Sequence, residues 1–489
     1  MASSSKVISN FFWRFFERVG AQGVKLLIEI ILARVLMPDD YGLIALVTVF
    51  ISVLNVFVSS GLGNALIQKK DADDLDFSSV FWFNVAMCIV LYTVLFFASP
   101  LLARFYSRTE LSSILRVLGL QIVISGVKNV QQAYVSRTMQ FKKFFFATLG
   151  GTLGAAVIGI WMAYHGYGVW ALVAQHLFNT LVDTIILWLT VKWRPKAVFS
   201  FERFKSLYSF GWKLLVSSLL ETIYTEIRQL VIGKIYSSAD LAYYNRGRQF
   251  PHLFVTNVNS SIDSVLLPTM SREQDNKARV RAMTRRAIQV STFIMAPLMM
   301  GLAFAGEPFV HLILTEKWMP CVPYVRIFCV AFMFYPIHTA NLNAIKALGR
   351  SDLFLRLEII KKIIGIIALL LTMNISPMAL AYSMLVTSII GQIVNSWPNR
   401  ELLGYRYIDQ LKDILPEILL SVAMGFCISF IALLGLNDLV TLLLQAFFGA
   451  AIYIVGAYLL KFESFHYFLT ALERRRKGQL PETQYLTDK

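Results

Sequence analysis

Long apolar runs alternate with short polar segments along almost the whole chain. A membrane-spanning helix needs about 20 mostly apolar residues, and Pro, Gly, Asn and charged positions separate fourteen such runs here. The pattern predicts an all-α polytopic membrane protein with about 14 transmembrane helices, at residues 11–36, 42–65, 79–103, 112–135, 144–163, 168–191, 207–235, 241–268, 287–313, 323–346, 353–373, 377–397, 413–434 and 438–460.

The composition supports this fold class. Of the 489 residues, 56% are hydrophobic and only 16% are charged, whereas soluble domains carry about 25% charged residues. No stretch has the polar composition of a soluble domain. A soluble multidomain protein, a disordered chain and a collagen-like chain are therefore excluded.

The basic residues of the loops predict how the chain is oriented. With the N-terminus inside, the cytoplasmic segments hold 28 Lys and Arg, and the outer loops hold only Arg104, Arg108 and Lys317. Positive charge collects on the cytoplasmic side of membrane proteins, so both termini are expected there. This placement also explains the net charge of +16, and no nucleic acid is expected as a partner.

The remaining basic residues lie within a few predicted helices and form stripes on two of them. At 100° per residue, Arg14, Arg18, Gln22, Lys25 and Glu29 share an arc of about 80°. An arc of similar width on the seventh helix holds five residues that include acids and bases. These are Lys213, Ser217, Glu221, Tyr224 and Arg228. Since such a stripe must face protein or water, it indicates a polar interior surface.

The two stripes are related by an internal repeat. Trp13 and Trp212 lie 199 positions apart, as do Arg14 and Lys213, and the spacing becomes 200 from Arg34 onward. The expected organisation is an N-terminal six-helix bundle (1–200), a repeat of that bundle (201–400), two further helices (401–460) and a basic cytoplasmic tail (461–489). Parallel repeats of this kind are a frequent transporter plan, with the substrate site between the halves.

Two arrangements of the intramembrane charges remain open: a dry network of ion pairs, or a water-filled basic cavity. Basic residues outnumber acids on these helices, which favours the cavity. The predicted substrate-binding residues are Arg18, Lys25, Lys128, Lys213, Tyr224, Arg228, Arg246 and Arg248. The predicted pairing or ion-coupling residues are Glu29, Asp183, Glu221 and Asp263.

The sequence lacks the signatures of an enzyme. It contains no H-E-x-x-H, G-x-x-x-x-G-K-[ST] or G-x-S-x-G motif, and its histidines have no metal-ligand spacing. We expect no catalytic activity, no metal and no cofactor, although coupling to H⁺ or Na⁺ is open. A recurrence of Ala147, Gly151, Ala155 and Gly159 predicts a helix-packing face.

Several local motifs resemble those of a known superfamily. The six, six and two arrangement resembles the multidrug/oligosaccharidyl-lipid/polysaccharide exporter superfamily. The local motifs are similar to those of its polysaccharide transporter branch, and of Wzx-type flippases of the colanic-acid and teichuronic-acid exporter kind. These motifs are Ile31-Leu32-Ala33-Arg34, Pro38, Tyr41-Gly42-Leu43, the Gly61-to-Lys70 segment, Phe81-to-Val85 and Glu316-Lys317-Trp318.

This resemblance implies a function and a location. Such a protein would move an undecaprenyl-diphosphate-linked oligosaccharide from the cytoplasmic to the outer leaflet of the bacterial inner membrane, by alternating access. Membrane lipids, a polysaccharide polymerase and a chain-length regulator would be its partners. The alternatives are a peptidoglycan lipid flippase, a drug/cation antiporter, and a non-transporting component of a glycan assembly complex.

Overall fold

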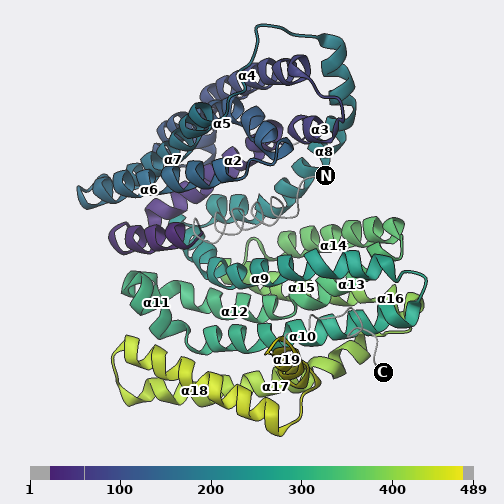
Figure 1. Cartoon of the computed structure of the whole chain (residues 1–489). Helices are drawn as coiled ribbons and strands as arrows, with labels where there is room; N and C mark the ends of the chain where they lie inside the picture. The colour runs from purple at the N-terminus through teal and green to yellow at the C-terminus, as the bar shows by residue number, and fades with distance from the viewer. Residues whose placement is uncertain (1–21, 60, 477–489) are drawn as a thin grey trace. The chain divides into compact units, whose positions relative to one another are not determined.

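Every regular element in the described part of the chain is helical. The structure, a computed structural model, describes residues 22–59 and 61–476 (Figure 1). A helix over residues 22–35 is followed by α2 (Pro38–Ser59), α3 (Leu62–Gln68), α4 (Asp74–Tyr106), α5 (Glu110–Arg137), α6 (Lys142–Tyr164), α7 (Val169–Thr190) and α8 (Phe201–Ile235).

The second part of the chain continues the helical pattern with shorter elements among the long ones. These are α9 (Ser238–Arg272), α10 (Lys277–Phe304), α11 (Gly306–Leu314), the 3-10 helix η1 (Glu316–Cys321), α12 (Val322–Met333), α13 (Tyr335–Ala347), α14 (Ser351–Thr372), α15 (Pro377–Ser396), α16 (Asn399–Leu402), α17 (Tyr407–Ser429), η2 (Phe430–Leu434), α18 (Asp438–Leu459) and α19 (Glu463–Arg476).

Ten segments of the described chain are long and apolar enough to cross a membrane. Each coincides with one of the fourteen predicted runs, which confirms the polytopic helical fold. Predicted runs 207–235, 241–268 and 353–373 correspond to helices α8, α9 and α14, but their polar and charged residues keep them outside this set. The first predicted run begins outside the described residues, so the count of fourteen stays a prediction.

The contacts divide the chain into two compact units, Met1–Ala242 and Tyr243–Lys489. The first unit includes α8, which packs on α2, α3 and α4. The sequence analysis expects this helix to begin the second repeat, after a boundary at residue 200. In the structure α8 packs on helices of the first repeat instead. The duplication itself stays a prediction.

Two glycines of the family-like motifs explain why α8 packs closely on the first unit. A Cβ atom at Gly42 would lie 1.8 Å from the backbone oxygen of Ser238, which follows α8. In the N-terminal third of α8, the backbone oxygen of Gly211 would lie 2.4 Å from a Cβ at Gly61. Only glycine permits such backbone approach, and small residues allow it between membrane helices generally.

A polar cluster fixes the start of α4 and the segment that leads into α8. Asp73 caps α4 by accepting from the Asp76 backbone N–H at 3.0 Å, and this bond, together with the charge of Arg203, lowers the pKa of the Asp73 carboxyl. The fully buried Asp76 pairs with Lys69 at 2.7 Å. Lys196 pairs with Asp74 at 2.7 Å, so the segment before α8 is tied to the α4 end.

The predicted small-residue face of α6 is confirmed as a packing surface. Ala147 and Ala155 are buried, and Cβ atoms at Gly151 and Gly159 would press on Asn179 and Gln175 of α7. In the second unit, α10 packs on α12, α13 and α17. The resulting core contains Met270, Ile288, Ile337, Tyr405 and Ile414.

We predict that Gly42→Ala lowers the stability of the protein by at least 1–3 kcal/mol, the usual cost of overpacking, because backbone atoms must separate. Gly23→Ala is the matched control, since a Cβ there meets nothing within 4 Å and alanine improves helix propensity. Denaturant unfolding in detergent micelles compares the two. Equal stability of the two variants would refute the close contact.

Candidate functional site

The helix over residues 22–35 presents a partly exposed ion pair. Lys25 Nζ lies 3.8 Å from Glu29, and their side chains are 66% and 20% exposed. This is the i, i+4 spacing expected on one helix face. Arg18, which shares the predicted stripe, lies outside the described residues. The attraction between Lys25 and Glu29 is therefore weak, because an exposed ion pair at this separation adds little to the stability of the protein.

The stripe of α8 contains the most unusual cation of the first unit. Arg228 is only 9% exposed, and its Nε is buried without a hydrogen-bond partner. No acidic side chain within residues 22–59 and 61–476 forms an ion pair with it. Lys213 and Glu221 on the same stripe are exposed, and Tyr224 is half-buried. A buried guanidinium normally requires an anionic partner, so Arg228 is the best candidate for binding an anion.

Lys128 and Asp183 occupy a different environment, in which their charges compensate. The ammonium of Lys128 on α5 donates to the carboxylate of Asp183 on α7 at 2.8 Å, and both side chains are 15% exposed. Two turns away, Gln121 donates to Thr180 at 2.9 Å across the same helix pair. The sequence predicted Lys128 for substrate binding and Asp183 for pairing or ion coupling, and the structure joins them as an interhelical pair.

The predicted residues of α9 belong to the second unit. Arg246 is 7% exposed, donates to Gln249 Oε1 at 2.5 Å and lies 5.5 Å from the centre of the Trp318 ring. This cation–π contact explains the tryptophan of the Glu316-Lys317-Trp318 motif. The next candidate, Arg248, is half-buried.

Asp263 lies nearer the other end of α9. Its carboxylate accepts from Asn343 Nδ2 of α13 at 2.6 Å, and it forms no ion pair with any described residue. Its predicted role in charge pairing or ion coupling therefore stays a prediction. That the α8 and α9 residues face one cavity stays a prediction, because they belong to separate compact units.

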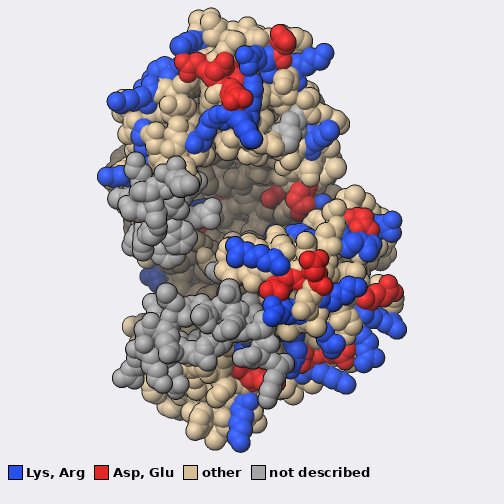
Figure 2. Space-filling view, turned by 45° about the vertical axis from the view of Figure 1, so that its right-hand side comes forward, with Lys and Arg blue, Asp and Glu red and all other residues tan. Residues whose placement is uncertain are grey.

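Some basic side chains at the surface lie beside acidic ones. Figure 2 shows Lys and Arg next to Asp and Glu on parts of one face. Arg279 with Glu273, Arg326 with Glu307, and Arg350 with Asp352 form ion pairs of this kind. Arg228 differs from these three arginines because it is buried and forms no ion pair with a described residue.

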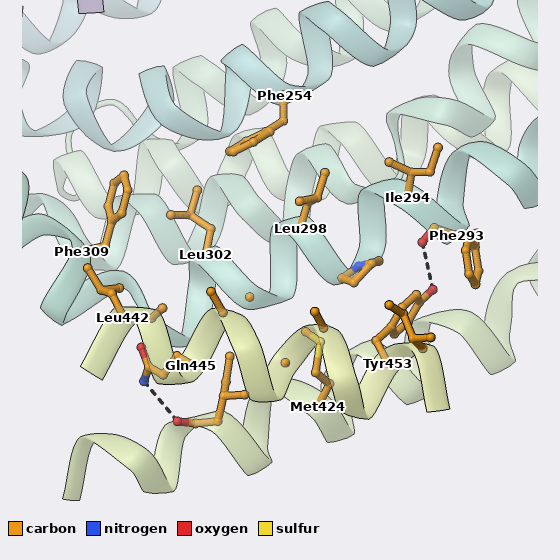
Figure 3. A pocket seen from close by; sticks show the side chains of 18 of the residues that line it. Phe254, Phe293, Ile294, Leu298, Leu302, Phe309, Met424, Leu442, Gln445 and Tyr453 are labelled. Carbon is orange, nitrogen blue, oxygen red and sulfur yellow. Dashed lines mark hydrogen bonds between the residues drawn. The ribbon is translucent and has the colours of Figure 1, made fainter. Parts of the chain in front are cut away.

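The second unit also contains an apolar groove that the sequence did not predict. Its volume is about 710 Å³, and it lies between α10 and the pair α17–α18, with α9, α11 and α19 at its edges (Figure 3). The small residues Gly301, Ala305, Ala446, Gly449 and Ala450 leave the space open. In the sequence, the groove is indicated only by these small residues. They predict a groove only if the helices that carry them are already known to face each other.

Two polar side chains of the groove lining donate hydrogen bonds to backbone carbonyls. Gln445 donates to the carbonyl of Ile428 at 3.1 Å, and the Tyr453 hydroxyl donates to the carbonyl of Phe293 at 3.0 Å (Figure 3). The groove therefore offers a hydrocarbon-like surface, suited to an aliphatic chain.

One end of the groove lies beside an exposed ion pair. Phe309 and Leu442 line this end, and the neighbouring His311 of α11 donates to the carboxylate of Asp438 at the start of α18. This hydrogen bond raises the pKa of His311. The pair therefore fastens α11 to α18 most strongly while the imidazole is charged.

Comparisons with known proteins agree with this arrangement. The succinoglycan biosynthesis transport protein ExoT of Rhizobium meliloti (strain 1021) is 28% identical over 65% of this chain and 64% of its own length, slightly under two thirds. The teichuronic acid biosynthesis protein TuaB of Bacillus subtilis (strain 168) is 23% identical over 77% and 78%. The lipopolysaccharide biosynthesis protein WzxC of Escherichia coli (strain K12) is 22% identical over 87% and 89%.

Solved structures share the fold at lower sequence identity. The lipid II flippase MurJ, in an inward closed conformation, is 16% identical and covers 93% of this chain and 98% of its own, with a TM-score of 0.75. A MATE family multidrug transporter of the MOP superfamily, facing inward, is 14% identical over 78% and 94%, with a TM-score of 0.61.

The family match extends from the first hairpin into the second unit. It spans residues 31–323, more than half of the chain, and includes α8, Arg228 and the Arg246–Trp318 contact. The chain therefore belongs to the family described as polysaccharide biosynthesis protein.

Proposed function

We propose that the protein is a flippase for undecaprenyl-diphosphate-linked oligosaccharide repeat units. It moves them from the cytoplasmic to the outer leaflet of the bacterial inner membrane during surface polysaccharide synthesis. Family membership and the transport and biosynthesis relatives support this proposal. The excess of basic loop residues on one side supports cytoplasmic termini.

The buried Arg228 is the observation that carries the proposal. A diphosphate is a strong acceptor of charge-assisted hydrogen bonds, and a guanidinium presents donors in a fork that matches its oxygens. Because Arg228 has no acidic partner among the described residues, its charge is available for an anionic headgroup. Arg18, Lys25, Lys213, Tyr224, Arg246 and Arg248 complete the proposed headgroup and glycan contacts.

The groove of the second unit suits the other end of such a cargo. An undecaprenyl chain is long and apolar, and the groove lining between α10 and α18 is almost wholly apolar. Inside the bilayer the chain leaves lipid and not water, so van der Waals packing against the groove, without a hydrophobic driving force, would hold it there. One protein would thus hold both parts of an amphiphile.

Alternating access between the two repeats would move the headgroup across the membrane. Proton or sodium coupling would drive it, with Glu29, Glu221 and Asp263 as ion-coupling candidates. A polysaccharide polymerase and a chain-length regulator would act on the product, so we place them as partners.

The first prediction concerns Arg228. Arg228→Gln should reduce flipping of a diphosphate-linked oligosaccharide in proteoliposomes at least tenfold, because each charge-assisted hydrogen bond contributes about 1.5–3 kcal/mol. Arg228→Lys should retain part of the rate. Arg350→Gln is the control, since Arg350 is exposed and already pairs with Asp352. Unchanged flipping by Arg228→Gln at equal expression would contradict the assignment.

The second prediction concerns the groove. Gly301→Phe should fill it and slow transport of a substrate with the full undecaprenyl chain by several-fold, while a short-chain analogue is transported almost normally. The same assay on Ala423→Phe, at an exposed position of α17 that does not line the groove, serves as control. Equal losses for long and short chains would show that Gly301→Phe acts through the fold.

The third prediction separates Lys128 from the cargo site. We place Lys128 and Asp183 as a structural pair, so Lys128→Met should destabilise the protein by about 3–5 kcal/mol by leaving a buried carboxylate unpaired. The exchange Lys128→Asp with Asp183→Lys should restore both stability and transport. If the Lys128→Met protein is stable and loses only substrate binding, Lys128 is a cargo-binding residue and the structural assignment is wrong.

A further inference from the structure

A buried carboxyl group lies on α17, away from the residues discussed so far. The Glu417 side chain is 4% exposed. Its Oε1 accepts from the Ser464 hydroxyl at 2.7 Å, and its Oε2 is buried without a hydrogen-bond partner in the described part of the chain. Half of the acceptor capacity of this group is therefore unused.

The groups around Glu417 leave a negative charge there without compensation. On α10, Arg285 is shared between Asp413 at 3.0 Å and Glu463 at 3.1 Å. Asp413, one turn before Glu417 on α17, also accepts from the Tyr405 hydroxyl at 2.6 Å. The two neighbouring acids thus take up the cation and repel a third negative charge.

The other elements packed on Glu417 contribute no positive charge either. The Tyr453 hydroxyl of α18 donates to the Phe293 carbonyl. The Ser421 hydroxyl of α17 donates to the backbone carbonyl of Glu417 at 2.7 Å, not to its carboxyl. Among the residues that the structure describes, only the Ser464 hydroxyl donates to the carboxyl.

An unpaired carboxylate in such a place costs several kcal/mol, and a group of this kind takes up a proton instead. We infer that Glu417 is a proton-binding site, loaded in this conformation and separate from the cargo contacts. On release, its O–H bond breaks, the proton passes to water and a carboxylate remains. The inference is independent of the proposed cargo.

Proton binding at this site is linked to the position of the last described helix. Ser464 belongs to the first turn of α19, and the next residue, Phe465, lines the groove near Phe293 and Tyr453. Tyr467 of α19 also lies under the guanidinium of Arg286, 4.1 Å from it. Proton loading therefore favours α19 docked against α10 and α17, with Phe465 at the groove end.

Loss of the proton should reverse this docking. A charged Glu417 is repelled by Asp413 and Glu463 and is better solvated by water than by one serine hydroxyl. Water can reach it only if the start of α19 moves away, which withdraws Phe465 from the groove. The proton at Glu417 would thus control one end of the groove.

Spin labels at two exposed positions, Leu433 in η2 between α17 and α18 and His466 in α19, test this link in the full chain. Double electron–electron resonance in nanodiscs should show α19 docked near pH 5 and at least half undocked near pH 9, a range of pH within which a buried carboxyl can titrate. Glu417→Gln should stay docked throughout. Glu401→Gln, a change at an exposed position of α16, should titrate like the wild type.

Infrared difference spectroscopy gives a second readout that does not depend on the variant's stability. The wild type should show the carbonyl stretch of a protonated carboxylic acid that disappears with rising pH, and Glu417→Asp should shift its frequency. Glu417→Gln titrating like the wild type in the distance measurement would overturn the inference. The inference would also be overturned if the wild-type spectrum showed no titrating carboxylic acid band, or if Glu417→Asp left that band unchanged.

Discussion

The cost of placing charge inside a membrane protein governs this molecule. A single charged side chain at the bilayer centre costs about 2.5–3.5 kcal/mol on the lenient insertion scale. The chain meets that cost in four ways: by an interhelical pair at Lys128 and Asp183, by a cation–π contact at Arg246, and, in our proposals, by a cargo anion at Arg228 and by a proton at Glu417. The first two stabilise the fold. In the last two, the charged group is available to bind a cargo anion or a proton.

The separation of these roles fits the chemistry of a lipid-linked glycan. Its diphosphate requires a cation that the protein has not already neutralised, and its tail requires an apolar surface. Arg228 on α8 and the groove beside α10 supply these separately. Close backbone contact at Gly42 and Gly61 fixes α8 within the first unit, so the position of the cation depends on two residues that carry no chemistry themselves.

The sequence predicted most of the fold because hydrophobic runs are long and local. It located all ten apolar spans and the packing face of α6. It did not predict the break in run 323–346, where Pro336 opens α13 after Phe334 and lacks the N–H needed to continue α12. The contacts of α8 with α2 to α4 depend on tertiary approach, which hydrophobic periodicity does not encode.

The candidate site was less predictable, because pairing depends on which helices are neighbours. Angles along α8 predict Arg228 as a residue of the polar stripe, but they do not show that it is buried without an acidic partner among the described residues. Lys128 and Asp183 are 55 positions apart, and only the α5–α7 contact joins them. Glu417 is a single acid near the start of predicted run 413–434, and only the Ser464 contact in the structure shows its buried environment.

The binding of two lipids that differ only in charge tests the central claim most directly. Titrating the purified protein with undecaprenyl diphosphate and with undecaprenol, for wild type and Arg228→Gln, separates headgroup from tail. The account predicts that the variant binds the diphosphate lipid at least tenfold more weakly and the alcohol equally well. Equal affinity of both proteins for the diphosphate lipid would contradict it.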